Sequence, residues 1–295
     1  MSYDGWILLT ASLVGLSCGL VGALLILRRM AMMADAISHT VLLGIVVAYL
    51  VTRELSGAHM LIGAAAAGLL TAVLVQGLHA RGVRQEASIG IVFTTLFAIG
   101  VILIATKVGN AHLDVQHALM GEITFIPWET ARVPGLGEVP EAVLTLLIVL
   151  LVVGGLIAAF YKEWKITSFD PALAAALGIP AAFMHYLFMT MISVTAVAAF
   201  DAVGAVMVIA MLITPAAAAY LWTDRLSVML LLSGLFGVLA AFAGYAAAWL
   251  LDTSISGSMA FATGVLFLIS FLISPRHGLA ARRLRAHAAA GRLKS

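Results

Sequence analysis

Residues 5–27 read GWILLTASLVGLSCGLVGALLIL, a run of 23 residues without a single charged side chain. About 20 apolar residues in helical conformation span the hydrocarbon core of a bilayer, which is about 30 Å thick. The preceding residues, Met-Ser-Tyr-Asp, contain no basic group, so the run lacks the basic n-region of a cleaved signal peptide. We therefore expect a transmembrane helix that is retained in the mature protein.

The apolar character extends along the whole chain. Of its 295 residues, 63% are hydrophobic and only 10% are charged, whereas an ordinary soluble domain has about 25% charged residues. So few charges cannot cover a water-facing surface, which excludes a soluble enzyme. The formal net charge of +2 gives no indication of nucleic-acid binding. Cys18 is the only cysteine, which excludes an intrachain disulfide and a metal site built from cysteines.

Eight further apolar runs follow, so the sequence predicts an all-α integral membrane protein with about nine transmembrane helices. The region 180–222 is almost uninterrupted, so counts of eight or ten remain open. The spans after the first are expected at 33–51, 59–79, 86–106, 141–161, 180–200, 203–222, 227–251 and 258–274. We expect a transmembrane domain at 1–275 and a basic cytoplasmic tail at 276–295.

The basic residues orient these spans, because Lys and Arg concentrate in cytoplasmic loops. If the first helix runs from outside to inside, 13 of the 16 basic residues lie on inner segments. The three that remain outside are Arg53, Lys107 and Arg132. We therefore predict that the N-terminus lies outside and the C-terminus inside.

The outer segment 107–140 is too long for a simple turn and contains three prolines. We expect a partial or re-entrant helix at 112–125, followed by an irregular loop. Four ionisable side chains in this segment could gather cations at an entrance, although an ordinary solvated surface is the favoured interpretation of any one of them. They are His112, Asp114, His117 and Glu122.

The inner segment 162–179 carries start and stop signals for a short helix. Asp170 followed by Pro171 is typical of an N-cap and a first helical position, and Gly178 is typical of a C-cap. We expect a cytoplasmic helix at 171–177. It is either a docking element or an ordinary amphipathic connector.

Ionisable side chains within a span are energetically costly and therefore mark candidate functional sites. Asp35 and His39 are four residues apart, so they share one face of the second span, about 6 Å apart along its axis. The two could ligate a divalent transition metal, with Ser38 nearby. The alternative is a carboxylate that orients a buried imidazole through a hydrogen bond, without metal.

Two other acidic residues are weaker candidates. Asp201 interrupts the apolar run near the predicted outer surface, and the alternative to a metal ligand is an N-cap of the following helix. Glu86 begins the fourth span, where a carboxylate near the helix N-terminus is the simpler interpretation. The sequence contains no Gly-x-x-x-x-Gly-Lys-Ser/Thr motif and so no ATP-binding loop of that type. Energy for transport must come from a partner or an ion gradient.

Four motifs, in this order, resemble the permease subunit of the bacterial ABC importers of manganese, zinc and iron. The first is RRMAMMADAISHTVLLG at 28–44, the second EASIGIVFT at 86–94, and the third SFDPALAAALG at 168–178. The fourth extends from AFDAVG at 199–204 through Thr214 and Pro215. The resemblance covers residues 5–275 and implies a multi-pass protein of the bacterial plasma membrane.

The resemblance also implies a type II importer, in which two identical or related permeases surround a translocation path. Two cytoplasmic ABC ATPase subunits and an extracellular or periplasmic metal-binding protein complete such systems. Asp35 and His39 match the metal-path motif of the family, and Asp201 matches an acidic partner position. The segment that matches the ATPase coupling helix contains Ser168, Phe169, Asp170, Pro171, Ala174, Leu177 and Gly178.

The expected cargo is manganese before zinc or iron, and no permanently bound cofactor is expected. The residues of the four motifs are closer to those of the manganese and iron branch of the family. No His-rich tract occurs, and an Asp with a His suits Mn²⁺. His39 is expected in the inner half of the membrane and Asp201 near its outer end. The two could share one metal site only if a span were kinked or shortened, and otherwise they would belong to two sequential sites along the path.

A proton- or sodium-coupled carrier is a second hypothesis, with Asp35 and Asp201 as protonation sites. It predicts an inverted repeat with discontinuous helices, which the sequence does not show. A structural subunit without a substrate path would leave Asp35 and His39 unexplained.

Overall fold

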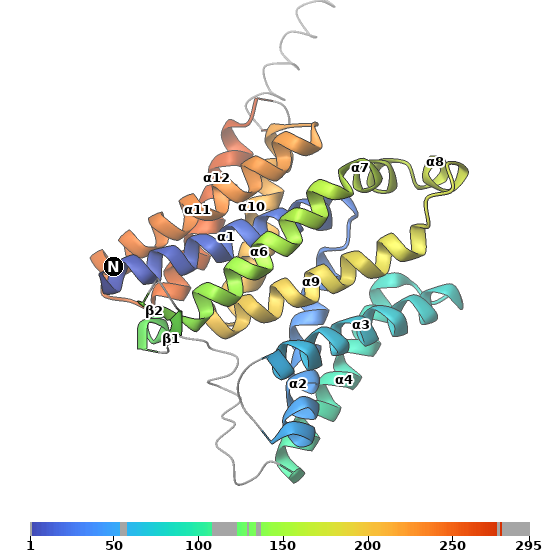
Figure 1. The fold of residues 1–295 in the computed structure, drawn as a ribbon. Helices are drawn as coiled ribbons and strands as arrows, with labels where there is room; N and C mark the ends of the chain where they lie inside the picture. The colour runs from blue at the N-terminus through green and yellow to red at the C-terminus, as the bar shows by residue number, and fades with distance from the viewer. Residues whose placement is uncertain are drawn as a thin grey trace, which may run out of the picture.

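A computed structural model describes residues 2–53, 58–107, 123–128, 130–133, 137–275 and 278. These residues are helical almost throughout (Figure 1). Within them, eight helices are long and apolar enough to cross a membrane. They are α1 (Tyr3–Leu27), α2 (Ala31–Thr52), α3 (Ala58–Ala80), α4 (Gln85–Lys107), α6 (Glu141–Ala159), α9 (Ala181–Val203), α11 (Leu226–Leu251) and α12 (Ile255–Ile273). A further apolar helix, α10 (Ala205–Trp222), is shorter.

Each span expected from the sequence corresponds to one of these helices, with ends that agree within three residues. The nearly uninterrupted region after residue 180 is divided at Gly204, whose φ of 81° lies outside the helical range and is accessible to glycine. The all-α membrane fold is therefore confirmed. The number of helices that cross the bilayer and the orientation of the termini stay predictions.

The helices form two groups (Figure 1). In the first, α1 packs mainly against α10 and α11, and α12 packs against α10 and α11. Glycines allow this close packing: a Cβ atom at Gly15 would lie 2.6 Å from the carbonyl carbon of Gly237. Nearby, the Ser233 hydroxyl donates a hydrogen bond of 2.7 Å to the Gly19 carbonyl oxygen. Small residues substitute here for a hydrophobic driving force, which lipid does not provide between helices.

The second group consists of α2, α3 and α4, and α9 lies between the groups in contact with both α2 and α3. A Cβ atom at Gly44 would lie 2.3 Å from the carbonyl oxygen of Gly63, so α2 and α3 approach closely. A Cβ atom at Gly68 would meet the Ser193 hydroxyl at 1.9 Å, so α3 and α9 do so as well. α2 is therefore enclosed on one side and open on another.

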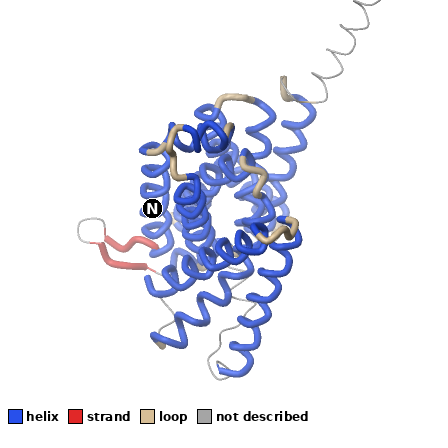
Figure 2. Tube along the Cα trace, turned by 90° about the vertical axis from the view of Figure 1, so that its right-hand side faces the viewer, coloured by secondary structure: helices blue, strands red, loops and turns tan. Residues whose placement is uncertain are grey.

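The connection between α4 and α6 contains two strands that the sequence did not predict. A 3₁₀ turn (η1, Ile126–Trp128) precedes β1 (Thr130–Val133) and β2 (Gly137–Pro140), which pair as an antiparallel hairpin in the register Thr130 to Pro140. The hairpin projects from the helices (Figure 2). The expectation of an irregular loop is wrong for these residues, because the prolines lie at and beyond the strand ends, where they remove no internal ladder bond. Most of the helix expected at 112–125 lies outside the described residues, and 123–125 form a turn.

The connection between α6 and α9 contains two short helices, α7 (Tyr161–Phe169) and α8 (Pro171–Ala176). The sequence predicted the second and missed the first. α7 carries polar residues on most of its faces, so it shows no long apolar pattern, and its one buried residue is Trp164. Trp164 is fully buried, donates a hydrogen bond of 3.2 Å to the Leu156 carbonyl oxygen, and packs against Phe188.

Candidate functional site

The predicted metal-binding pair lies on the open face of α2. Asp35 and His39 expose 38–39% of their side chains, and Met32, one turn earlier on the same face, is 58% exposed. The residues between them are buried against the other helices: Ile37 is fully covered and Ser38 is 4% exposed. One stripe of α2 is thus uncovered in the single chain, and it carries both ionisable side chains.

The two side chains lie close together without a hydrogen bond between them. The His39 Nε2 and Asp35 Oδ1 atoms are 3.7 Å apart, which is beyond the usual length of a hydrogen bond. The alternative interpretation, a buried imidazole held by a carboxylate hydrogen bond, is therefore not supported: the imidazole is half-exposed and the carboxylate does not reach it. Both groups keep lone pairs available for an ion on the open face.

Two aromatic side chains of α4 position the imidazole of His39. The Phe93 ring stacks on it with centroids 5.6 Å apart, and the Phe97 ring meets it edge-on at 5.7 Å. Phe93 belongs to the second sequence motif, but that motif alone did not indicate this contact. The spacing of four residues between the two rings, on one face of α4, is the signal that could have revealed it.

Two predicted ligands, Ser38 and Asp201, do not join the pair in a single chain. The Ser38 hydroxyl donates a 2.5 Å hydrogen bond to the Asp35 carbonyl oxygen and is turned away from the open face. Asp201 is exposed in the last turn of α9, and the residue that caps α10 is Gly204. The N-cap interpretation of Asp201 is therefore wrong. Across the described residues no group of three His, Cys, Asp or Glu side chains is assembled for a metal ion.

The surroundings of Glu86 fit the simpler of its two interpretations. It lies in the first turn of α4, and its Oε2 atom is 3.6 Å from a guanidinium nitrogen of Arg84. Both side chains are highly exposed. Seven residues separate Glu86 from Phe93, so it lies about 10 Å along α4 from the ring that stacks on His39.

The predicted coupling segment forms an exposed, well-capped helix. The Asp170 carboxylate accepts a 2.9 Å hydrogen bond from the Leu173 backbone N–H, and Pro171 occupies the first turn, as expected. Gly178 has a φ of 76°, which suits the end of a helix. Ala174 is fully buried. The apolar side chains of Phe169, Leu173 and Leu177 are each about half-exposed, which is unusual for a solvated connector.

The four candidate entrance residues, His112, Asp114, His117 and Glu122, and nearly all of the basic tail lie outside the described residues. On the side where the 123–128 segment packs, a cavity of about 730 Å³ lies between the α9–α10 and α11–α12 connections. Its walls include Thr124, Gly204 and Asp252. It does not include Asp35 or His39, so it is separate from the pair.

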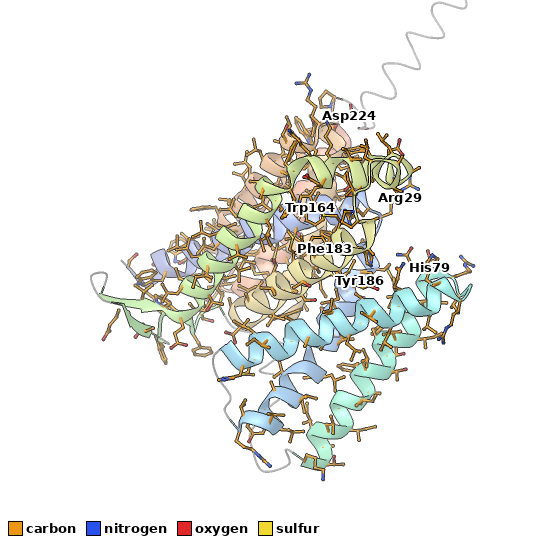
Figure 3. All side chains as sticks on the ribbon, turned by 45° about the vertical axis from the view of Figure 1, so that its right-hand side comes forward. Arg29, His79, Trp164, Phe183, Tyr186 and Asp224 are labelled. Carbon is orange, nitrogen blue, oxygen red and sulfur yellow. The ribbon has the colours of Figure 1, made fainter. Side chains whose placement is uncertain are left out.

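Arg28 is the residue whose role sequence reasoning missed. Its guanidinium lies at the end of α1, between α7 and α9, in contact with Trp164 and Phe188. Figure 3 labels Trp164 and Arg29, the next residue in the chain, at this end of the molecule. Arg28 belongs to the first sequence motif, but adjacent arginines at a predicted inner surface indicated only orientation.

The chain is similar to proteins of known systems over nearly its whole length. The family described as "ABC 3 transport family" matches residues 4–274. A manganese transport system membrane protein, MntD of Bacillus subtilis, is 58% identical over 285 residues, which cover 97% of each chain. A zinc transport system membrane protein, TroD of Treponema pallidum, is 42% identical over 94% of this chain and 76% of its own.

A solved structure agrees with the fold. PsaBC from Streptococcus pneumoniae, in complex with Fab, matches with a TM-score of 0.80 and 33% identity, over 97% of this chain and 96% of that chain. This likeness supports the permease fold that the resemblance implied.

Proposed function

The chain belongs to the ABC 3 transport family, and on that premise we propose that it carries a divalent transition metal, Mn²⁺ before Zn²⁺ or Fe²⁺, across the plasma membrane. It is a membrane permease subunit of an ABC transport system and not an enzyme, so ATP hydrolysis belongs to a partner subunit. An ATPase and a metal-binding protein outside the membrane accompany such a permease. A proton- or sodium-coupled carrier, the second hypothesis from the sequence, would not belong to this family.

The observation that carries the proposal is the Asp35–His39 pair on the open face of α2. Carboxylate oxygen and imidazole nitrogen are ligands that Mn²⁺, Zn²⁺ and Fe²⁺ all accept. The two ligand atoms are 3.7 Å apart. With metal–ligand distances of about 2.1 Å, the ligand–metal–ligand angle at the ion would be about 120°. Small side-chain rotations would bring this angle to the value that a tetrahedral or octahedral ion requires.

Within the described part of one chain, this site has only two of the ligands that such an ion needs. A second permease, identical or related, that presents the same face of its α2 would provide two more, and water would complete the shell. Incomplete coordination suits a transport path, because the ion must be bound firmly enough to enter and weakly enough to leave. Asp201 then acts at a second, outer position of the path.

Manganese is proposed first because the relative with 58% identity is named for manganese transport, whereas the relative named for zinc transport is 42% identical. The residues of the pair do not themselves separate the two ions. No cofactor is bound permanently, and the metal is the cargo. The residues His112, Asp114, His117 and Glu122 are proposed to receive it at the outer surface.

We also propose that α8 with its flanking residues is the contact with the ATPase. The segment comprises Ser168, Phe169, Asp170, Pro171, Ala174, Leu177 and Gly178. Its support is the combination of a capped, rigid helix with exposed apolar side chains, which a soluble partner could bury. A connector without a partner would have polar side chains at these positions.

The test is uptake of Mn²⁺, Zn²⁺ and Fe²⁺ by the complete complex, with ATPase and binding protein, in liposomes. We expect ATP-dependent uptake that is fastest for Mn²⁺. Removing a second-shell partner of a metal ligand lowers affinity about 10- to 100-fold, so Asp35→Asn and His39→Ala should each reduce uptake by at least as much. His79→Ala, an exposed histidine at the end of α3, is the matched control and should transport normally.

Two results would contradict the proposal. Wild-type uptake by both Asp35→Asn and His39→Ala would show that the pair does not handle the ion. Uptake that follows a proton or sodium gradient and not ATP would favour the carrier hypothesis.

A further inference from the structure

The Arg28 side chain connects the end of α1 to α7 and α9 through four contacts. The Arg28 Nε atom donates a 3.2 Å hydrogen bond to the Ser168 hydroxyl, and a terminal nitrogen donates one of 2.8 Å to the Thr167 hydroxyl. The guanidinium carbon lies 5.2 Å from the centroid of the Trp164 ring and 4.9 Å from that of Phe188. Both distances are within the range of cation–π interactions.

These contacts use the properties that distinguish arginine from lysine. A guanidinium donates several hydrogen bonds in fixed directions and stacks on aromatic rings at the same time. Burial lowers the pKa of Arg28 to about 10, so the group stays charged at neutral pH. Three of its four contacts are with α7, which leads directly into α8.

α8 depends on this connection, because it has few others. It packs mainly against α7 and only slightly against α9. A cavity of about 630 Å³ lies beside it, lined by Arg28, Arg29, Phe169 and Tyr220 among others. The position of α8 relative to the helical bundle is therefore set largely through α7 and Arg28.

The connection from Arg28 to α2 is short and rigid. The Met30 N–H donates to the Leu25 carbonyl oxygen and the Arg29 N–H to the Ile26 carbonyl oxygen, each at 3.0 Å. Arg29 has a φ of 56°. These are the features of a Schellman motif, in which the helix end is closed by two reverse hydrogen bonds. Met30 and Leu25 are both buried, which adds the apolar contact that accompanies the motif.

Met30 is also the N-cap of α2, so no loop residue separates the closed turn from the helix that carries Asp35 and His39. Asp35 lies five residues after Met30, about 7.5 Å along the helix. A displacement of α7 therefore reaches the metal-binding pair through one side chain and one rigid turn.

We propose that Arg28 is a positioning residue that couples the α7–α8 segment to α2, so that movement of the ATPase contact shifts the Asp35–His39 pair. This inference rests on the proposed role of α8. Arg28 does not touch the cargo. Its function is to make the two elements move together.

The experiment compares metal moved per ATP hydrolysed, in liposomes that contain the full complex, with Mn²⁺ as the probe. In Arg28→Gln we expect the ATPase to remain bound and to hydrolyse ATP within about twofold of wild type. The number of ions moved per ATP should fall about threefold to thirtyfold, the range for residues that carry coupling between sites. Arg28→Lys should lie between Arg28→Gln and wild type. Arg29→Gln removes the same charge from the neighbouring exposed side chain and should match wild type.

A second readout reports the movement itself. Met32→Cys, in a background with Cys18→Ser, carries a fluorescent label on the open face of α2. ATP binding should change its signal in wild type and in Arg29→Gln, and the change should be lost in Arg28→Gln although ATP still binds. A residue needed only for folding would not separate these two effects.

Thr167→Val combined with Ser168→Ala removes both hydroxyl acceptors and leaves the arginine in place, so it tests the same link if Arg28→Gln fails to assemble. An unchanged ratio of ions to ATP in either variant, or an equal loss in Arg29→Gln, would overturn the inference. Failure of the proposed function would be recognised separately, because the wild-type complex would then show no ATP-dependent Mn²⁺ uptake.

Discussion

Replacing Gly22 with alanine tests the packing of α1, the helix that ends at Arg28. A Cβ atom at this position would lie 1.9 Å from the Leu212 carbonyl oxygen of α10 and 3.2 Å from the Ala216 Cβ atom. Carbon and carbonyl oxygen atoms approach to about 3.3 Å in close helix contacts. α1 and α10 would have to separate by roughly 1.4 Å, since the obstacle is backbone and not a flexible side chain.

The magnitude follows from two opposing effects. Overpacking of a buried site costs about 1–3 kcal/mol, and a gap of this size removes much of the dispersion energy along the contact, so the upper value applies. Alanine in place of a helical glycine recovers about 1 kcal/mol. The net loss is about 2 kcal/mol, and at about 2–4 °C per kcal/mol the apparent melting temperature should fall by roughly 4–8 °C.

The assay is the thermal loss of monodisperse protein in detergent, followed by fluorescence-detected gel filtration. Gly154→Ala is the control, because Gly154 is also in a helix interior and a Cβ atom there meets nothing within 4 Å. It should keep or slightly raise the melting temperature. A Gly22→Ala protein as stable as Gly154→Ala would refute the packing of α1 against α10.

Three further predictions concern the site and its surroundings. Phe93→Leu should raise the KM for Mn²⁺ uptake several-fold with little change in the maximal rate, because His39 loses its stacking partner; an unchanged KM would show that the ring does not position the imidazole. Asp170→Ala should remove the cap of α8, at about 1 kcal/mol, and weaken ATPase binding about fivefold in a titration, whereas equal affinity would exclude α8 as the contact. In a Cys18→Ser background, a cysteine at Ser256 should react with an impermeant thiol reagent added outside and one at Gly82 should not; the reverse pattern would invert the orientation.

The positions of the helices could be predicted from the sequence because long apolar runs with few charges have little alternative to a membrane helix. Which face of each helix is buried could not be predicted. Leu146 is fully buried and Leu151 is 65% exposed, yet both are leucines in the same run of α6. In lipid the outer face of a helix is as apolar as its packed face, so the periodic pattern that reveals buried faces in soluble proteins is absent.

The site was predictable to the extent that its residues are close in sequence. Asp35 and His39 share a face because they are one turn apart, and Asp170 with Pro171 marks the start of α8 because capping is local. Contacts across the chain had no such signal. Thr167 is 139 residues from Arg28, and the pairing depends on how α7 folds back over α1. The alternative role of Asp201 as an N-cap was wrong because α9 continues to Val203, beyond the expected end of its span at residue 200.

The place of the pair along α2 matters for its mechanism. Asp35 and His39 lie in the first three turns, near the end that the Schellman turn and Arg28 hold, and Thr52 at the other end is about 20–26 Å away from them along the helix. If α2 pivots near Thr52, the displacement is largest at its near end, so Asp35 and His39 would move by more than half of the displacement at Met30. Ligands in the last turns would hardly move. On the proposed mechanism, a displacement that the ATPase imposes at the membrane surface would therefore change the distance between two such pairs in facing permeases, and with it the number of protein ligands that hold the ion.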